Sequence, residues 1–258
     1  MERLAQTNRT RGMSASGLRL AGYLCLLMGV AGKGLIQNAM LGLTGLNTQE
    51  MMAVLEQSRD AMTLATVSIV LQALETCAVP IFAFLLVEGF LKTSSYKNYL
   101  IRVILVALAS EIPYNLAFGG RFFVMDSRNP VFAMVVCLLM LYFYQYFSGR
   151  SARNIAIKAV VTVSALLWSG MLGIEHGAFL ALMVAVFYLM RGKPGFQLLA
   201  GCGAAGVATL FSLFNLTAPF SCLLLYLYNG EKGDSNRVFN LICYPLMLLI
   251  AGIAAIYL

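Results

Sequence analysis

Nine apolar stretches follow one another along this chain, and most of them are close to the length that spans a bilayer. About 20 helical residues cross roughly 30 Å of hydrocarbon, and inside hydrocarbon the backbone must satisfy its own hydrogen bonds. Of the 258 residues, 60% are hydrophobic and only 11% are charged. The sequence therefore predicts an all-α integral membrane protein, a polytopic bundle of about nine transmembrane helices over residues 17–38, 61–91, 98–118, 130–148, 153–171, 174–190, 196–212, 215–229 and 238–257.

The positions of the basic residues predict how this bundle is oriented. Lys and Arg collect on the cytoplasmic side of membrane proteins. With a cytoplasmic N-terminus and nine spans, the 18 Lys and Arg fall on that side with four exceptions: Lys33, Arg59, Arg121 and Arg128. We expect residues 1–16 to form a basic cytoplasmic tail before a retained first helix, and residues 17–258 to form a single bundle. The net charge of +7 then indicates contact with anionic membrane lipids rather than with nucleic acid.

The segment Val79–Phe90, with the sequence VPIFAFLLVEGF, combines a proline and a carboxylate inside an apolar stretch. Pro80 lacks a backbone donor, so it predicts a kink. Two interpretations of Glu88 are open. An acidic side chain at membrane depth marks a functional site by default, but Lys92 lies four residues on, where an ordinary helical ion pair forms.

Other polar side chains lie inside or at the ends of predicted spans. Glu75 is near the middle of the second span, Glu111 and Asn115 share a face of the third, and Glu175 and His176 open the sixth. The pair on the third span has a structural alternative, because it flanks a proline that frees backbone groups. His176 is either an interfacial structural residue or a general base, since its ordinary pKa lies near neutrality.

Cysteine, histidine and glycine patterns suggest no further chemistry. The six cysteines fall in different apolar stretches, and the chain has one histidine, so we expect buried thiols and no metal site. Gly201, Gly203 and Gly206 spell GxGxxG inside an apolar helix, without the strand that a dinucleotide fingerprint needs. We expect these glycines to permit close helix packing in lipid.

Several segments together carry a resemblance to a known family. In their order and spacing they resemble the TraX family of membrane proteins, which is related to pilin N-acetyltransferase and to larger acyltransferases that use cytoplasmic acyl-coenzyme A. The matching segments are Val79–Phe90, Lys97–Phe118, Asn129–Phe132, Glu175–Phe179, Tyr228–Gly233 and Tyr244–Leu249. The resemblance implies a multi-pass protein of the cell membrane, most simply the bacterial cytoplasmic membrane.

The chain departs from the family pattern at four positions. Ala31 and Gly32 stand where the family has an Asp-His pair, Met247 stands where it has a second histidine, and Thr76 replaces an arginine. If those histidines deprotonate the acceptor in the family, this chain either relocates the base or does not catalyse that step.

Two functions from different classes follow from the resemblance. The first is an acyltransferase that moves an acetyl or other acyl group from acyl-coenzyme A to a membrane-inserted peptide or protein, or to another amine or hydroxyl. Its predicted catalytic residues are Glu88, Glu175 and His176, its acceptor-binding residues are Glu75, Glu111 and Asn115, and its donor-binding residues are Arg102, Asn229, Lys232 and Arg237. The second is a non-catalytic relative that acts as a transporter component or scaffold, which the loss of the Asp-His pair favours.

Overall fold

A computed structural model describes residues 12–43, 45–56, 58–122, 127–149, 151–234 and 237–257. Within these ranges the chain is all-helical, as predicted, and strand pairing is limited to two isolated bridges, Met13 with Tyr228 and Arg128 with Ile174. Most of the predicted tail lies outside the described residues. The elements are α2 (Ala15–Gly29), η1 (Val30–Met40), α3 (Thr48–Glu56), α4 (Arg59–Glu75), α5 (Ala78–Lys92), α6 (Tyr96–Gly119), α7 (Val131–Tyr146), α8 (Ala152–Met171), α9 (Gly177–Leu189), α10 (Pro194–Ala208), η2 (Leu213–Phe220), α11 (Ser221–Tyr226) and α12 (Arg237–Tyr257).

Five helical stretches in the described part are long and apolar enough to cross a membrane. They are Ala15–Met40, Arg59–Lys92, Tyr96–Gly119, Ala152–Met171 and Val238–Ala255. The other predicted stretches coincide with shorter helices, among them α7, α9 and the segment Leu213–Tyr226. Membrane-spanning character is thus a property of the fold, while the count of nine and the cytoplasmic N-terminus stay predictions.

The second predicted span is broken one turn before Pro80 rather than at the proline itself. Helix α4 ends at Glu75 and α5 begins at Ala78, because Pro80 cannot donate a hydrogen bond to the carbonyl of Thr76. The turn closes instead through Val79 N–H and the Thr76 carbonyl at 3.2 Å. The Thr76 hydroxyl, fully buried, donates to the Phe214 carbonyl at 3.0 Å and lies 3.1 Å from the Thr217 hydroxyl. The break is therefore fixed against η2.

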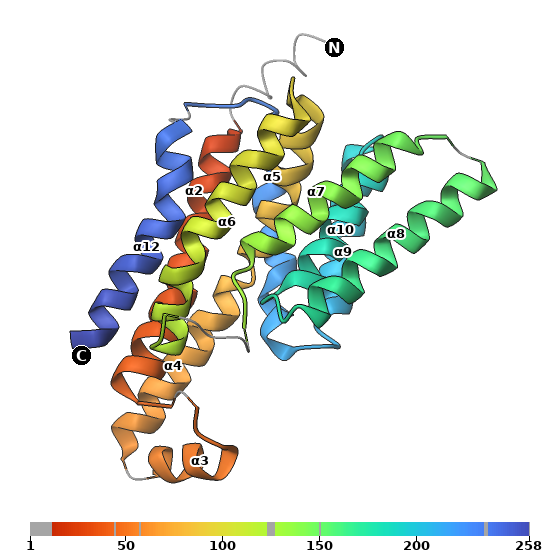
Figure 1. Cartoon of the computed structure of the whole chain (residues 1–258). Helices are drawn as coiled ribbons and strands as arrows, with labels where there is room; N and C mark the ends of the chain where they lie inside the picture. Colours follow the sequence, from red (N-terminus) through yellow and green to blue (C-terminus); the bar gives the residue numbers. More distant parts are fainter. Residues whose placement is uncertain are drawn as a thin grey trace.

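Two apolar clusters hold the bundle together. The larger one packs α5, α7 and α9 around fully buried side chains such as Tyr144, Phe187 and Met183. The smaller one joins α6, α12 and η1 around Tyr114 and Leu248. Figure 1 shows the corresponding division, with α12 beside α6 at one edge and α8 to α10 at the other.

Glycine packing corrects the expectation for the GxGxxG segment. A Cβ built on Gly201 would lie 2.4 Å from the ring of Phe187, but nothing lies within 4 Å of one built on Gly203 or Gly206. Only the first glycine is needed for close packing, and it accommodates a side chain rather than a helix backbone. The close approach of two helices occurs at Gly32, where a Cβ would lie 2.8 Å from the Ser68 carbonyl oxygen of α4.

Candidate functional site

A partly buried ion pair joins η1 to the loop before α9. The Lys33 ammonium contacts a carboxylate oxygen of Glu175, and the side chains are only 26% and 22% exposed. Tyr114 of α6 donates its hydroxyl hydrogen to the other Glu175 oxygen and lies 2.8 Å from the Ser127 hydroxyl. Lys33 also lies 5.0 Å from the ring centroid of Phe118. Three elements therefore converge on one carboxylate.

The loop that carries Glu175 is fixed by its backbone. Arg128 N–H donates to the Gly173 carbonyl at 2.9 Å, and Glu175 N–H donates to the Arg128 carbonyl at 3.1 Å. His176 then adopts a left-handed conformation with φ of 53°, the single positive φ among described non-glycine residues. A residue other than glycine persists in this strained region only where the surrounding structure holds its backbone in place. The strain places His176 directly before α9, next to the ion pair.

Glu75 completes a group that we call the Lys33 cluster, made of Lys33, Glu75, Tyr114, Glu175 and His176. Its carboxylate lies over Gly29, where a Cβ would come within 1.9 Å of a Glu75 oxygen, so a larger residue there would displace the Glu75 side chain. Glu75 interacts electrostatically with both Glu175 and Lys33. The cluster thus places two carboxylates around one ammonium inside the bundle.

Electrostatics in the loop favour an ionised Glu175 beside a neutral His176. Burial alone would raise the pKa of Glu175, but Lys33 and His176, with hydrogen bonds from Lys33 and Tyr114, lower it below the usual value. Burial lowers the pKa of His176, and Lys33 adds to this effect, while Glu175 opposes it. Near neutral pH the imidazole is uncharged and is able to accept a proton.

Glu111 and Asn115 lie on α6 near Phe122 and Asn129. Asn129 donates its backbone N–H to Glu111, and Asn115 donates its amide to the Phe122 carbonyl at 3.2 Å. One oxygen of each, Glu111 Oε2 and Asn115 Oδ1, is buried without a hydrogen-bond partner. Tyr244 of α12 donates to Asn129 Oδ1 at 3.3 Å and lies close enough to Glu75, Glu111 and Glu175 to interact electrostatically. The predicted acceptor residues therefore border the Lys33 cluster.

Glu88 lies apart from this group. Its carboxylate pairs with Lys92 at 2.6 Å and accepts a hydrogen bond from Tyr228 at 3.2 Å. It follows Glu75 by thirteen residues, or about 20 Å of helix at 1.5 Å per residue. The structure brings Glu175 and His176 together and does not bring Glu88 to them.

The predicted donor-binding residues are divided between a loop and a helix. Asn229 and Lys232 lie in the loop 227–233, which packs on the start of α2 through Asn229 N–H to the Met13 carbonyl at 3.0 Å and Ser16 N–H to the Lys232 carbonyl at 3.2 Å. Lys92 donates to the Gly230 carbonyl at 3.1 Å, so it lies at the same end. Arg102 is exposed on α6, and the Arg237 side chain lies outside the described part.

Sequence reasoning missed Lys33 and Tyr114. Lys33 is a cation between Val30 and Leu35 in an apolar stretch, and a charge at such a depth is itself a signal of a buried partner. Tyr114 carried no comparable signal, because an aromatic residue in a span is most often part of the core.

Fold and site together define a helical integral membrane protein with a buried charged cluster. The family model described as "TraX protein" matches residues 36–254, and the chain belongs to this family. No curated protein and no solved structure matches the chain.

Three of the positions at which we expect the sequence to depart from the family pattern are packed against neighbouring helices. Gly32 lies against the α4 backbone, with the Ser68 hydroxyl donating to its carbonyl at 2.8 Å. Thr76 ties the α4–α5 break to η2, and Met247 packs against the cluster around Tyr114. Lys33 follows Gly32 in the sequence, and Glu75 precedes Thr76, so each of these two positions has a charged neighbour.

Proposed function

We propose that this protein is a membrane acyltransferase with its general base at His176. Membership of the TraX family supports acyl transfer as the reaction class. The observation that carries the assignment to this site is the fixed, left-handed His176 beside a Glu175 carboxylate that is held by Lys33 and Tyr114. A base next to an oriented carboxylate is the arrangement that general base catalysis uses.

The proposed reaction starts with proton transfer to the imidazole. As an acceptor amine or hydroxyl attacks the thioester carbonyl of an acyl-coenzyme A, the new C–N or C–O bond forms and His176 takes the acceptor's proton. The C–S bond then breaks, and the thiolate leaves with that proton. The role of Glu175 is to orient His176 and to stabilise its cationic form while the proton is held, and Lys33 holds the Glu175 carboxylate in place.

The donor's phosphates would lie at the end of the bundle that carries the loop 227–233. Lys232 is exposed there, with Asn229 beside it, and Arg102 and Arg237 are the further candidates for phosphate contacts. This end is separated from Glu75 by about 20 Å of helix. That separation suits a donor whose phosphates stay at the surface while its extended thioester arm reaches inward.

Glu75, Glu111 and Asn115 would bind the acceptor, a membrane-inserted peptide or protein or another amine or hydroxyl. The unpartnered oxygens of Glu111 and Asn115 favour a group that donates hydrogen bonds. With this function we place the protein in the bacterial cytoplasmic membrane with its N-terminus on the cytoplasmic side.

The test is transfer of radiolabel from acetyl-coenzyme A to peptides, proteins and lipids by the purified protein in native-lipid nanodiscs. His176→Asn is the decisive variant, because Asn tolerates the left-handed conformation but cannot act as the base. We expect labelling to fall by at least 100-fold in His176→Asn and to persist in Glu88→Gln, which serves as the matched control.

The packing of Gly32 against α4 favours one other function, a non-catalytic relative acting as a transporter component or scaffold. In that case the family's base position has been closed by helix packing and no base replaces it. Absence of labelling, in a preparation where a family member that retains its Asp-His pair is active, would refute acyl transfer and leave this second function.

A further inference from the structure

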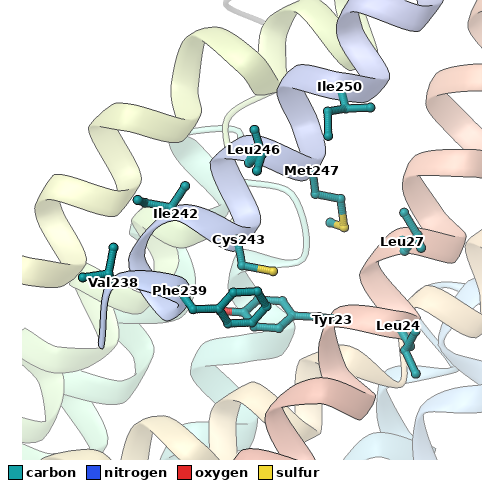
Figure 2. Close-up of a pocket in the computed structure, with 10 residues that line it drawn as sticks. All are labelled: Tyr23, Leu24, Leu27, Val238, Phe239, Ile242, Cys243, Leu246, Met247 and Ile250. Carbon is teal, nitrogen blue, oxygen red and sulfur yellow. The ribbon is translucent and has the colours of Figure 1, made fainter. Parts of the chain in front are cut away.

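An apolar groove runs between α2 and α12 on the outside of the bundle. Helix α2 packs on α4 and α5, whereas α12 packs on α6 and η1, so the two helices leave a space of about 550 Å³ between them. Figure 2 shows Phe239, Cys243 and Met247 of α12 on the side that faces Tyr23 and Leu27 of α2. Leu24, Ile242 and Leu246 also line the groove. Both helices belong to stretches that can span a membrane, so the groove faces hydrocarbon.

The walls of the groove do not suit a partner helix. Helices approach one another closely in lipid through Gly, Ala, Ser and Thr. None of the ten residues that line the groove in the described part is of these types. Leu24, Leu246 and Ile250 instead project large side chains that are about half exposed.

The dimensions of the groove favour a flexible chain. From Val238 to Ile250 the lining extends over twelve residue steps of α12, or about 18 Å of helix. A helix 10–12 Å in diameter would occupy roughly 1,400–2,000 Å³ over this length, more than the groove encloses. An acyl chain is long, thin and apolar, and each buried methylene contributes about 0.8 kcal/mol of transfer free energy.

One end of the groove is polar, and a basic residue of α2 lies near it. Tyr23 lines this end and donates its hydroxyl hydrogen to the Asn240 carbonyl at 3.3 Å. Arg19 lies one helical turn before Tyr23 and interacts with it electrostatically. A guanidinium beside the end of an apolar groove matches a phosphate linked to an acyl chain.

We infer that this groove binds one acyl chain of an anionic phospholipid, with the headgroup phosphate at Arg19. The inference concerns a lipid site on the outer face of the bundle and does not depend on acyl transfer. The lipid would lie against Met247, whose side chain also packs on the cluster around Tyr114, so it would form the outer wall of the region beside the Lys33 cluster.

The experiment measures quenching of a single tryptophan by brominated lipids. The reporter is Phe239→Trp, at the groove, in a Trp168→Phe background, because the chain has one tryptophan. The protein is placed in phosphatidylcholine nanodiscs that contain brominated phosphatidylglycerol or brominated phosphatidylcholine. The control reporter is Leu167→Trp in the same background, on α8 and 59% exposed, away from the groove.

We expect the groove reporter to prefer phosphatidylglycerol by about fivefold, since one basic residue near a membrane surface contributes about 1 kcal/mol. Arg19→Gln should abolish the preference, and Arg19→Lys should retain it. Leu246→Phe, which fills the groove, should reduce quenching at the groove reporter by either lipid. Equal preference at both reporters, an unchanged preference in Arg19→Gln, or a groove reporter that neither lipid quenches would each overturn the inference.

Discussion

Replacing Lys33 with Met should destabilise the protein by about 3.5–4 kcal/mol. The change keeps an unbranched apolar stem but leaves the Glu175 carboxylate with Tyr114 as its remaining side-chain partner. Removing one partner of a fully buried ion pair costs about 3–5 kcal/mol. Because the two side chains retain roughly a quarter of their exposure, we take the low end of that range, and loss of the Phe118 contact adds about 0.5–1 kcal/mol.

The double variant separates the charge effect from the loss of packing. Adding Glu175→Gln to Lys33→Met removes the uncompensated carboxylate, so the free energy of unfolding should return to within about 1 kcal/mol of the wild type. The single variants should therefore couple by about 2–3 kcal/mol in a double-mutant cycle. The defect of Lys33→Met should also shrink as the pH falls and the Glu175 carboxylate takes up a proton.

The assay is reversible unfolding in mixed micelles, followed by circular dichroism at pH 7 and pH 5. A cost below 1 kcal/mol for Lys33→Met would show that water reaches the pair and that the cluster is not a buried site. Additive single variants would refute the claim that Lys33 and Glu175 act on each other. Phe118→Leu measures the ring contact separately.

Three further predictions concern single residues. Because the pKa of His176 is lowered in the folded protein, its contribution to stability is complete above about pH 6.5 and is lost as the pH falls through the lower folded pKa. The variant His176→Asn should therefore flatten the dependence of the unfolding free energy on pH in this window. Gly32→Ala should cost about 1–3 kcal/mol because its Cβ would meet the α4 backbone, whereas Gly206→Ala, with open space around it, should be neutral or slightly stabilising; equal melting temperatures would contradict this reading. Glu88→Gln should change the unfolding free energy by less than about 1 kcal/mol, since Lys92 is 56% exposed, and a larger loss would mean that the pair is more important than its exposure indicates.

The helices were predictable because their signal is local. Hydrocarbon imposes a minimum length on each apolar stretch, and every predicted stretch falls on a helical element of the structure. Pro80 predicts a break in the helix. The break lies one turn before the proline, because the carbonyl that loses its hydrogen-bond donor is that of Thr76. The predicted role of Gly203 and Gly206 in packing was wrong, because sequence spacing does not say which face of a helix meets a neighbour.

The candidate site was only partly predictable because its contacts are non-local. Glu75, Glu175 and His176 stand out as polar groups among apolar ones, which a sequence shows directly. Lys33 was assigned to the outer half of the membrane as a topological charge, and its ion pair joins residues 142 positions apart. No periodicity reports such a pairing, since it depends on how η1, α6 and the loop before α9 pack.

The unusual winding of η1 has a consequence for how this chain tolerates change. Over Val30–Met40 the chain forms a π-helix, in which each backbone N–H donates to the carbonyl five residues earlier rather than four. One such hydrogen bond joins Leu41 N–H to the Ile36 carbonyl at 3.0 Å. Removing one residue between Lys33 and Met40 while this winding is kept would turn the residues before the deletion relative to those after it. If the residues after Met40 stay anchored, neither Lys33 nor Gly29 could then keep its partner. A length change here would disturb the charged interior more than most substitutions, so the number of residues in this segment is itself part of the site.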